Sequence, residues 1–187
     1  MVKRVMGMVI VMIVAAVAIV SMVLRAQNAD QKQAPTLKSV LMQQLKDTHN
    51  NSNWFVCADV ALAGVTPEQA NWTDGKGNHS VGQLAYHIWF WNERNLRNMR
   101  GEHPEKFSGN NDETFDKFDA KSWSETVQKL DAVLTELEKT VENADEAKLK
   151  AIAPTIANIN AHNAYHIGEI VMVRKEQGSW DPSRGVK

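Results

Sequence analysis

Two histidines stand four residues apart in the C-terminal part of the chain, in the segment His162-Asn-Ala-Tyr-His166. On an α-helix, residues at i and i+4 lie on one face with Cβ atoms about 5–6 Å apart, so their two imidazoles can bind one metal ion. Pairs at this spacing also occur in helix interiors, where they only hydrogen-bond within the core. The pair by itself therefore leaves both alternatives open, a metal site and a polar contact in the core.

Other polar residues share this helix face. At about 100° per residue, Asn158 and Glu169 fall on the same side of the helix as the two histidines. The rest of the segment is apolar and includes Ile167, Ile170, Val171, Met172 and Val173. A helix that is apolar on most sides is expected to be buried, so its histidines and its glutamate need polar partners.

Glu169 is the candidate catalytic residue, because it lies three residues after His166 on that face. A carboxylate in this position orients a ligand imidazole or acts as a base on metal-bound water. The alternative is an ion pair with a cation of a neighbouring helix, such as Arg94.

A third histidine, His87, lies in the middle of another expected helix, between Leu84 and Trp91. Taken alone, a helix histidine in such a position is more often a hydrogen-bonded core residue than a metal ligand. If its helix neighbours the one with His162 and His166, three neutral imidazoles meet and leave coordination positions open, as in a catalytic metal site. Imidazole suits zinc first and nickel second, whereas the shortage of thiolates and carboxylates disfavours an iron–sulfur or calcium site.

The remaining candidates are weaker. His49 lies in a polar segment and has some chance of reaching the site, whereas His79 and His103 are expected in solvent. The single cysteine, Cys57, lies in an apolar run and is expected inside the protein, so no internal disulfide can form. Four aromatic residues either line a substrate pocket or belong to the core, namely Tyr86, Trp89, Trp91 and Tyr165. Two amide residues, Asn158 and Gln83, are candidates to support the metal ligands.

Four helices are expected to position these residues, and no segment alternates as a strand would. The expected helices cover residues 36–63, 80–100, 122–141 and 154–177. Ser80 is a natural N-cap, Ser122 and Glu125 form a capping-box pattern, and Gly178 follows the last helix. Pro154 is tolerated in a first turn and is taken as the start of that helix. Four helices with unequal loops predict an all-α four-helix bundle.

Two motifs together resemble one known family. Ser80-Val-Gly-Gln-Leu-Ala-Tyr-His87 and His162-Asn-Ala-Tyr-His166-Ile-Gly-Glu169 are similar to signatures of the DinB-like (YfiT-like) superfamily of metal-dependent enzymes. The resemblance covers roughly residues 36–180. It implies a four-helix bundle, often a homodimer, in which His87, His162 and His166 bind a divalent metal ion.

The N-terminal segment has the pattern of an export signal. Lys3 and Arg4 precede an uncharged, apolar run from Val5 to Leu24, which is long enough to span a bilayer as a helix. Residues 1–26 are therefore expected to be a signal peptide or a membrane anchor, residues 27–35 a linker, and residues 36–187 the DinB-like domain. The basic start is expected to stay in the cytoplasm, so the domain would be extracytoplasmic and would meet the membrane only through this segment.

Composition limits the partners. The chain has 187 residues, which favours one domain, and its formal net charge is −1. Because Lys3, Arg4 and Arg25 belong to the N-terminal segment, the remaining body is mildly acidic. Nucleic acid is therefore excluded as an expected partner, since its phosphates require an excess of cations.

Three functions agree with these patterns. The first is a hydrolase that acts on a small molecule through metal-bound water. The second is a thiol-dependent S-transferase or isomerase, as the resemblance implies for some relatives, and the third is a non-catalytic metal-binding module. Hydrolysis is preferred because reduced thiols are scarce outside the cytoplasm, whereas water is always present.

Overall fold

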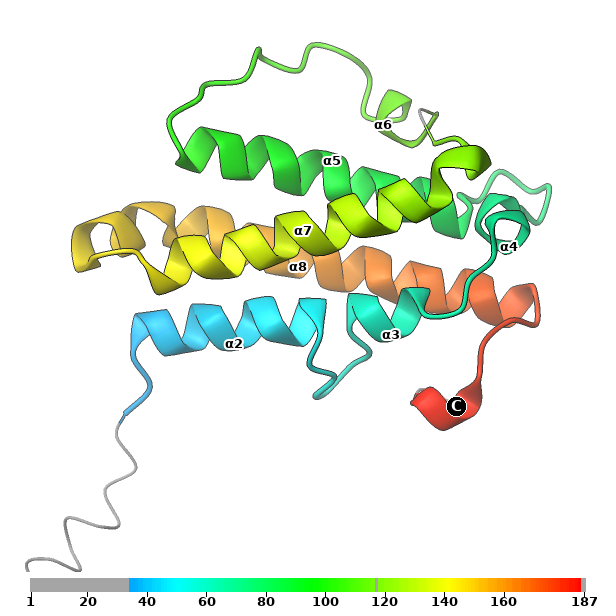
Figure 1. Cartoon of the computed structure of the whole chain (residues 1–187), viewed down its shortest axis with the longest axis horizontal. Coiled ribbons are helices and arrows are strands. Elements are labelled where there is room, and N and C mark those ends of the chain that lie inside the picture. Colours follow the sequence, from blue (N-terminus) through cyan, green and yellow to red (C-terminus); the bar gives the residue numbers. More distant parts are fainter. Residues whose placement is uncertain (1–33, 117, 186–187) are drawn as a thin grey trace, which may run out of the picture. The chain divides into compact units, whose positions relative to one another are not determined.

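The computed structural model describes residues 34–116 and 118–185, so the expected export segment, residues 1–26, lies outside the described part. Within these ranges every regular element is a helix and there is no strand, which confirms the all-α prediction for the described residues (Figure 1). None of the helices in these two ranges is both long and apolar enough to cross a membrane.

Four helical segments build the core. Helix α2 (Leu37–His49) and helix α5 (Val81–Met99) each pack against both α7 (Trp123–Glu142) and α8 (Glu146–Glu176) (Figure 1). Between them lie fully buried aliphatic side chains, among them Leu45, Leu84, Leu134, Ile156 and Ile170. The shorter elements are α3 (Ala58–Leu62), α4 (Pro67–Asn71), α6 (Glu113–Asp116) and the 3-10 turns Ala120–Ser122 and Pro182–Arg184.

The first expected helix, residues 36–63, is two helices. Helix α2 ends at His49 and α3 begins at Ala58, and the residues between them form bends and irregular backbone. The asparagines and serine of residues 50–53 explain the break, because their short polar side chains compete with the helix for backbone hydrogen bonds. Cys57 follows this segment and is fully buried, as predicted.

Helix α5 agrees with the prediction. The Ser80 hydroxyl accepts a hydrogen bond from the backbone of Gln83, whose side chain accepts one from the Ser80 N–H, so the two residues form a capping box. Near this end, the ring of Phe118 packs directly over Gly82. A Cβ atom at position 82 would lie 2.2 Å from that ring, so this close approach requires glycine.

Helices α7 and α8 correct two expectations. Helix α7 begins at Trp123, but Ser122 does not cap it, because Ser122 ends a 3-10 turn and its hydroxyl donates to the Asp119 carbonyl instead. Helix α8 begins at Glu146, eight residues before Pro154, with Asp145 as its N-cap. Pro154 therefore lies inside the helix, where it removes one backbone hydrogen bond without ending the apolar face.

Candidate metal centre

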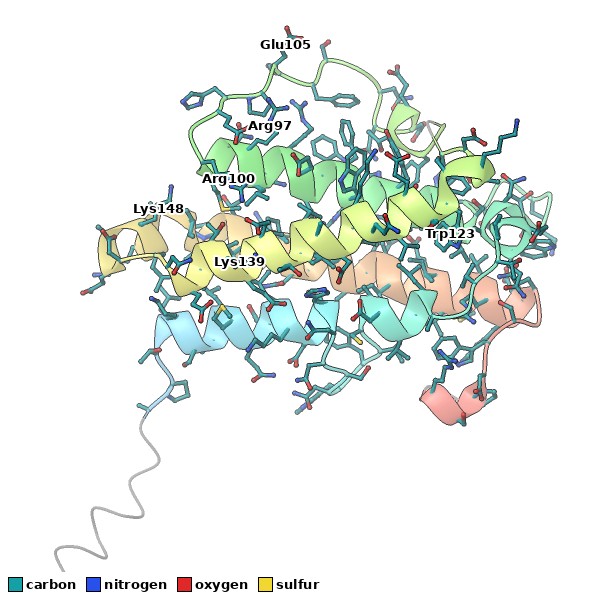
Figure 2. All side chains as sticks on the ribbon, in the orientation of Figure 1. Arg97, Arg100, Glu105, Trp123, Lys139 and Lys148 are labelled. Carbon is teal, nitrogen blue, oxygen red and sulfur yellow. The ribbon has the colours of Figure 1, made fainter. Side chains whose placement is uncertain are left out.

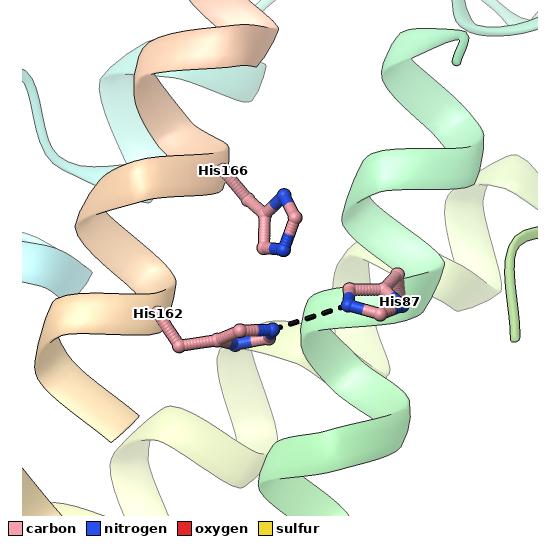
Figure 3. Close-up of side chains that lie close together, drawn as sticks. All are labelled: His87, His162 and His166. Atoms are coloured by element: carbon pink, nitrogen blue, oxygen red, sulfur yellow. Dashed lines mark hydrogen bonds between the residues drawn. The ribbon is translucent and has the colours of Figure 1, made fainter. Parts of the chain in front are cut away.

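Three histidines from two helices meet between α5 and α8. His87 lies on α5, and His162 and His166 lie one turn apart on α8 (Figure 3). One candidate ligand nitrogen from each residue lies within 4.8 Å of the other two. His87 and His166 are buried and His162 is half-buried. The residues that the sequence singled out as metal ligands are therefore close enough to hold one ion.

An amide pair joins the two helices beside this group. Asn92 of α5 donates to the side-chain oxygen of Asn163 of α8 at 2.8 Å, and Asn163 donates back at 3.4 Å. Both asparagines are almost fully buried. Because Asn163 follows His162 directly, this contact fixes how the two histidine-bearing helix faces are aligned. Sequence reasoning missed both residues.

Thr114 determines which nitrogen of His87 carries the lone pair. Its hydroxyl lies 2.6 Å from the Asn111 carbonyl and 2.5 Å from His87 Nδ1. A hydroxyl has one hydrogen, and a carbonyl oxygen can only accept, so Thr114 donates to Asn111 and accepts from His87 Nδ1–H. His87 Nε2 therefore carries the lone pair, and it accepts a hydrogen bond from His162 Nε2–H at 3.1 Å (Figure 3).

Glu169 holds His166 in the same way. Glu169 Oε2 accepts from His166 Nδ1 at 2.6 Å, which leaves the His166 Nε2 lone pair free for a metal. The alternative pairing with Arg94 is not formed, since Arg94 donates to the Glu105 carbonyl. Glu169 also lines a different cavity from the three histidines. This geometry favours the orienting role over that of a base.

Burial keeps two of the imidazoles neutral. It lowers the pKa of His87 to about 3, with a further contribution from His166 and His162. Burial also lowers the pKa of His162 to about 4, together with the neighbouring His166. Both rings therefore keep a lone pair at neutral pH, as metal binding requires.

The donor set fits a divalent ion of the zinc type. Two nitrogens that bind one tetrahedral zinc ion at about 2.0–2.1 Å are about 3.3 Å apart, close to the distance between His87 Nε2 and His162 Nε2. Two of the three rings also have Nδ1 held by an oxygen, which is the usual arrangement around metal-bound histidines. The residues present can thus hold a metal ion.

A cavity of about 560 Å³ opens onto the three histidines. Trp91 and Tyr165 line it, as two of the four aromatic candidates, and so does Asn158. Apart from the histidines, all its lining residues are uncharged, namely Trp91, Asn92, Asn95, Asn111, Thr155, Asn158, Ile159 and Tyr165. Tyr86 and Trp89 lie outside the lining, and Gln83 is used in capping α5.

The other histidines do not join the group. His79 was expected in solvent but stacks on Phe115, whose ring also stacks on His87, with centroid distances of 3.7 and 4.0 Å. His103 is exposed, as expected. His49 is buried and contacts acidic residues instead of the three histidines.

Comparison with known proteins gives one match. A sequence model described as the DinB superfamily matches residues 58–170, a range that includes all three histidines as well as Thr114 and Glu169. No curated protein and no solved structure matches the chain.

Proposed function

Because the chain belongs to the DinB superfamily, we propose that it is a metal-dependent hydrolase of a small molecule, with one divalent ion bound by His87, His162 and His166. The single observation that carries this proposal is the meeting of three imidazoles at a cavity of about 560 Å³. Zinc is the first candidate and nickel the second, since imidazole suits both. The packing of α2 and α5 on α7 and α8 supports the four-helix bundle architecture expected for the domain.

A divalent ion with three histidine ligands can lower the pKa of water to about 7 and so supply hydroxide at neutral pH. Residues of the chain orient the metal ligands and offer hydrogen bonds to the substrate. Thr114 accepts a hydrogen bond from Nδ1 of His87, and Glu169 accepts one from Nδ1 of His166. In each ring Nε2 is therefore the nitrogen left to bind the ion. The asparagine and threonine side chains in the cavity offer donors and acceptors to an uncharged polar substrate.

The domain is proposed to work outside the cytoplasm. This rests on the basic start, the uncharged run from Val5 to Leu24, and the polar residues that follow. A periplasm-active reporter fused after Lys187 tests the location. Reporter activity is expected only if the C-terminus is exported, and a fusion that works only in the cytoplasm would contradict the proposal.

Metal content and turnover test the function. Protein purified without a histidine tag is expected to lose one equivalent of metal in the His162→Ala plus His166→Ala variant, measured by elemental analysis. The metal-loaded protein is then assayed with ester, amide and electrophile panels, with and without added thiols. Turnover without thiol that disappears in His87→Ala supports hydrolysis. Turnover that requires a thiol would replace it by S-transfer, and metal binding without any turnover would favour a binding module.

A further inference from the structure

A second group of metal-ligating side chains lies around His49, at the C-terminal end of α2. The His49 side chain is 3% exposed, and both of its ring nitrogens contact carboxylates. Nδ1 lies 2.7 Å from Glu138 Oε1, and Nε2 lies 2.9 Å from Asp131 Oδ1 and 4.0 Å from Asp59 Oδ1. These residues come from α2, α3 and α7, so tertiary packing brings them together. They share no residue with the three-histidine group.

The charges of this group are not balanced. Three carboxylates surround one imidazole, and within the described residues every ion pair of these carboxylates is with His49. A protonated imidazole neutralises only one of three negative charges. A divalent cation bound to the neutral imidazole neutralises two. A divalent ion would therefore leave less uncompensated negative charge at this group than a proton does.

We propose that His49, Asp59 and Asp131 form a second binding site for a divalent transition-metal ion. One candidate ligand atom from each lies within 4.8 Å of the other two. Glu138 accepts from His49 Nδ1–H, so Nε2 is the nitrogen directed at the two aspartates, as in metal sites where a carboxylate orients a ligand histidine. One imidazole with two carboxylates suits zinc or manganese, and binding releases the proton from Nε2.

The neighbouring cavity gives this site access from outside. Asp59 and Asp131 both line a cavity of about 710 Å³, and their side chains are 50% and 60% exposed. Its walls are mainly apolar and include Leu62, Val65, Val127, Leu130 and Leu134. Trp123, at the start of α7 near α4 (Figure 2), also lines this cavity, about 12 Å along the helix from Asp131. The ion would thus lie at one end of the cavity, with free coordination positions facing it.

The test measures Zn²⁺ titrated into chelator-treated, full-length protein. The background is the His162→Ala plus His166→Ala variant, which lacks the first group of ligands. We expect it to bind one equivalent of zinc. Adding Asp131→Asn or Asp59→Asn should weaken that binding at least about tenfold, and Glu138→Gln should weaken it by about 10- to 100-fold.

Glu125→Gln is the matched control, because Glu125 lies on the same helix as Asp131 and its side chain is also 60% exposed. It should leave zinc binding unchanged. A folded background that binds no zinc, or equal binding by the Asp131→Asn and Glu125→Gln variants, would reduce the His49 group to an ion-pair cluster.

The wild-type protein separates this proposal from the first. It should bind two equivalents. Asp131→Asn in the wild-type chain should bind one with unchanged affinity and the other at least about tenfold more weakly, a comparison that does not depend on the background folding. If the three-histidine group does not bind metal, wild type and background bind the same number of ions. If the His49 group does not bind metal, the wild type and the Asp131→Asn variant bind the same number of ions with the same affinities.

Discussion

Thr114 is the residue on which the geometry of His87 most directly depends. It is completely buried, and its hydroxyl connects His87 Nδ1 to the Asn111 carbonyl. Thr114→Val keeps the shape of the side chain but leaves the buried Nδ1–H without an acceptor. We expect zinc binding at the three-histidine group to weaken by about 10- to 100-fold, measured by competition with a chromophoric chelator.

Thr114→Ser should retain binding, because the hydroxyl is kept. The control is Thr140→Val, which removes a hydroxyl that also donates to a backbone carbonyl, on α7. Equal affinities for the Thr114→Val and Thr140→Val variants would show that Thr114 does not position the ligand.

Glu169→Gln separates the two roles that the sequence left open for this residue. The amide oxygen can still accept from His166 Nδ1, but it lacks the negative charge that makes the ring a better ligand. If Glu169 orients the ligand, zinc affinity falls by about tenfold and the pH profile of any turnover keeps its shape. Loss of turnover at full zinc occupancy, with loss of the acidic limb of the pH profile, would instead identify a base.

The lowered pKa values predict how the metal-free protein responds to acid. His87 and His162 have pKa values of about 3 and 4, below the value of 6.5 for a free imidazole. Below pH 6.5 the unfolded chain binds protons at these residues and the folded chain does not, so stability falls as pH falls toward 4. Each histidine should contribute a loss of about 1.4 kcal/mol per pH unit.

Urea unfolding of chelator-treated protein at pH 7.5, 6.0 and 5.0 measures this effect. The His87→Gln variant should show a smaller loss of unfolding free energy between pH 6.0 and pH 5.0 than the wild type. A His103→Gln variant, altered at an exposed position, should follow the wild type. Equal losses in all three proteins would mean that His87 is not held neutral by burial.

At the scale of elements, the segment from α6 to Phe118 forms one wall of the three-histidine group, since it carries Thr114 and Phe115. Phe118 packs over Gly82 of α5. In Gly82→Ala the added methyl group overlaps the Phe118 ring, so the ring must shift. We expect a loss of about 1–3 kcal/mol in the free energy of unfolding and weaker zinc binding.

Gly168→Ala is the matched control, because Gly168 is also in a helix but has open space where a Cβ would lie. It should preserve zinc binding and stabilise the protein slightly, since alanine favours the helix. Denaturation curves and zinc titrations of the two variants give the comparison. A Gly82→Ala variant as stable as wild type would show that the segment yields without cost.

Features that depend on local sequence signals could be predicted from the sequence, whereas features that depend on long-range contacts could not. Helix α5 and its start at Ser80 were predictable because the cap and the apolar period are local. The start of α8 was missed because Pro154 fits a first turn, although Asp145, which caps the helix nine residues before Pro154, was a local signal.

The candidate site divides in the same way. His162 and His166 were predictable from their spacing, and His87 from the motif shared with the family. Thr114 could not be found, because its partner His87 is 27 residues away and its own segment has no period. The pairing of Asn92 with Asn163 spans 71 residues, and no local pattern announces it.

At the scale of the whole domain, Arg174 connects three parts of the chain. It is buried on α8, donates to the carbonyls of Ala61 and Ala63 at the end of α3, and donates to the Ser179 carbonyl beyond α8. Arg174→Met leaves these acceptors without their partner, at a cost on the order of 2 kcal/mol of unfolding free energy. Thermal and urea unfolding should detect it.

Zinc affinity of Arg174→Met should equal that of the wild type, because the residue lies two turns beyond His166 and touches none of the three histidines. Arg97→Met, at an exposed position on α5, is the control for loss of one positive charge. If the two variants are equally stable, Arg174 does not hold these segments together.

The placement of His87 and His162 on separate helices, 75 residues apart along the chain, gives a bound ion a mechanical role as well. The sequence has a single cysteine and so cannot form an internal disulfide. An ion bound by residues of both α5 and α8 would be a reversible metal cross-link between the two helices. Because the ligands meet only in the folded chain, an ion present at about 100 times its Kd would stabilise the fold by about 2.7 kcal/mol. Loss of the ion would then make the chain more susceptible to proteolysis, whether or not the site has enzymatic activity.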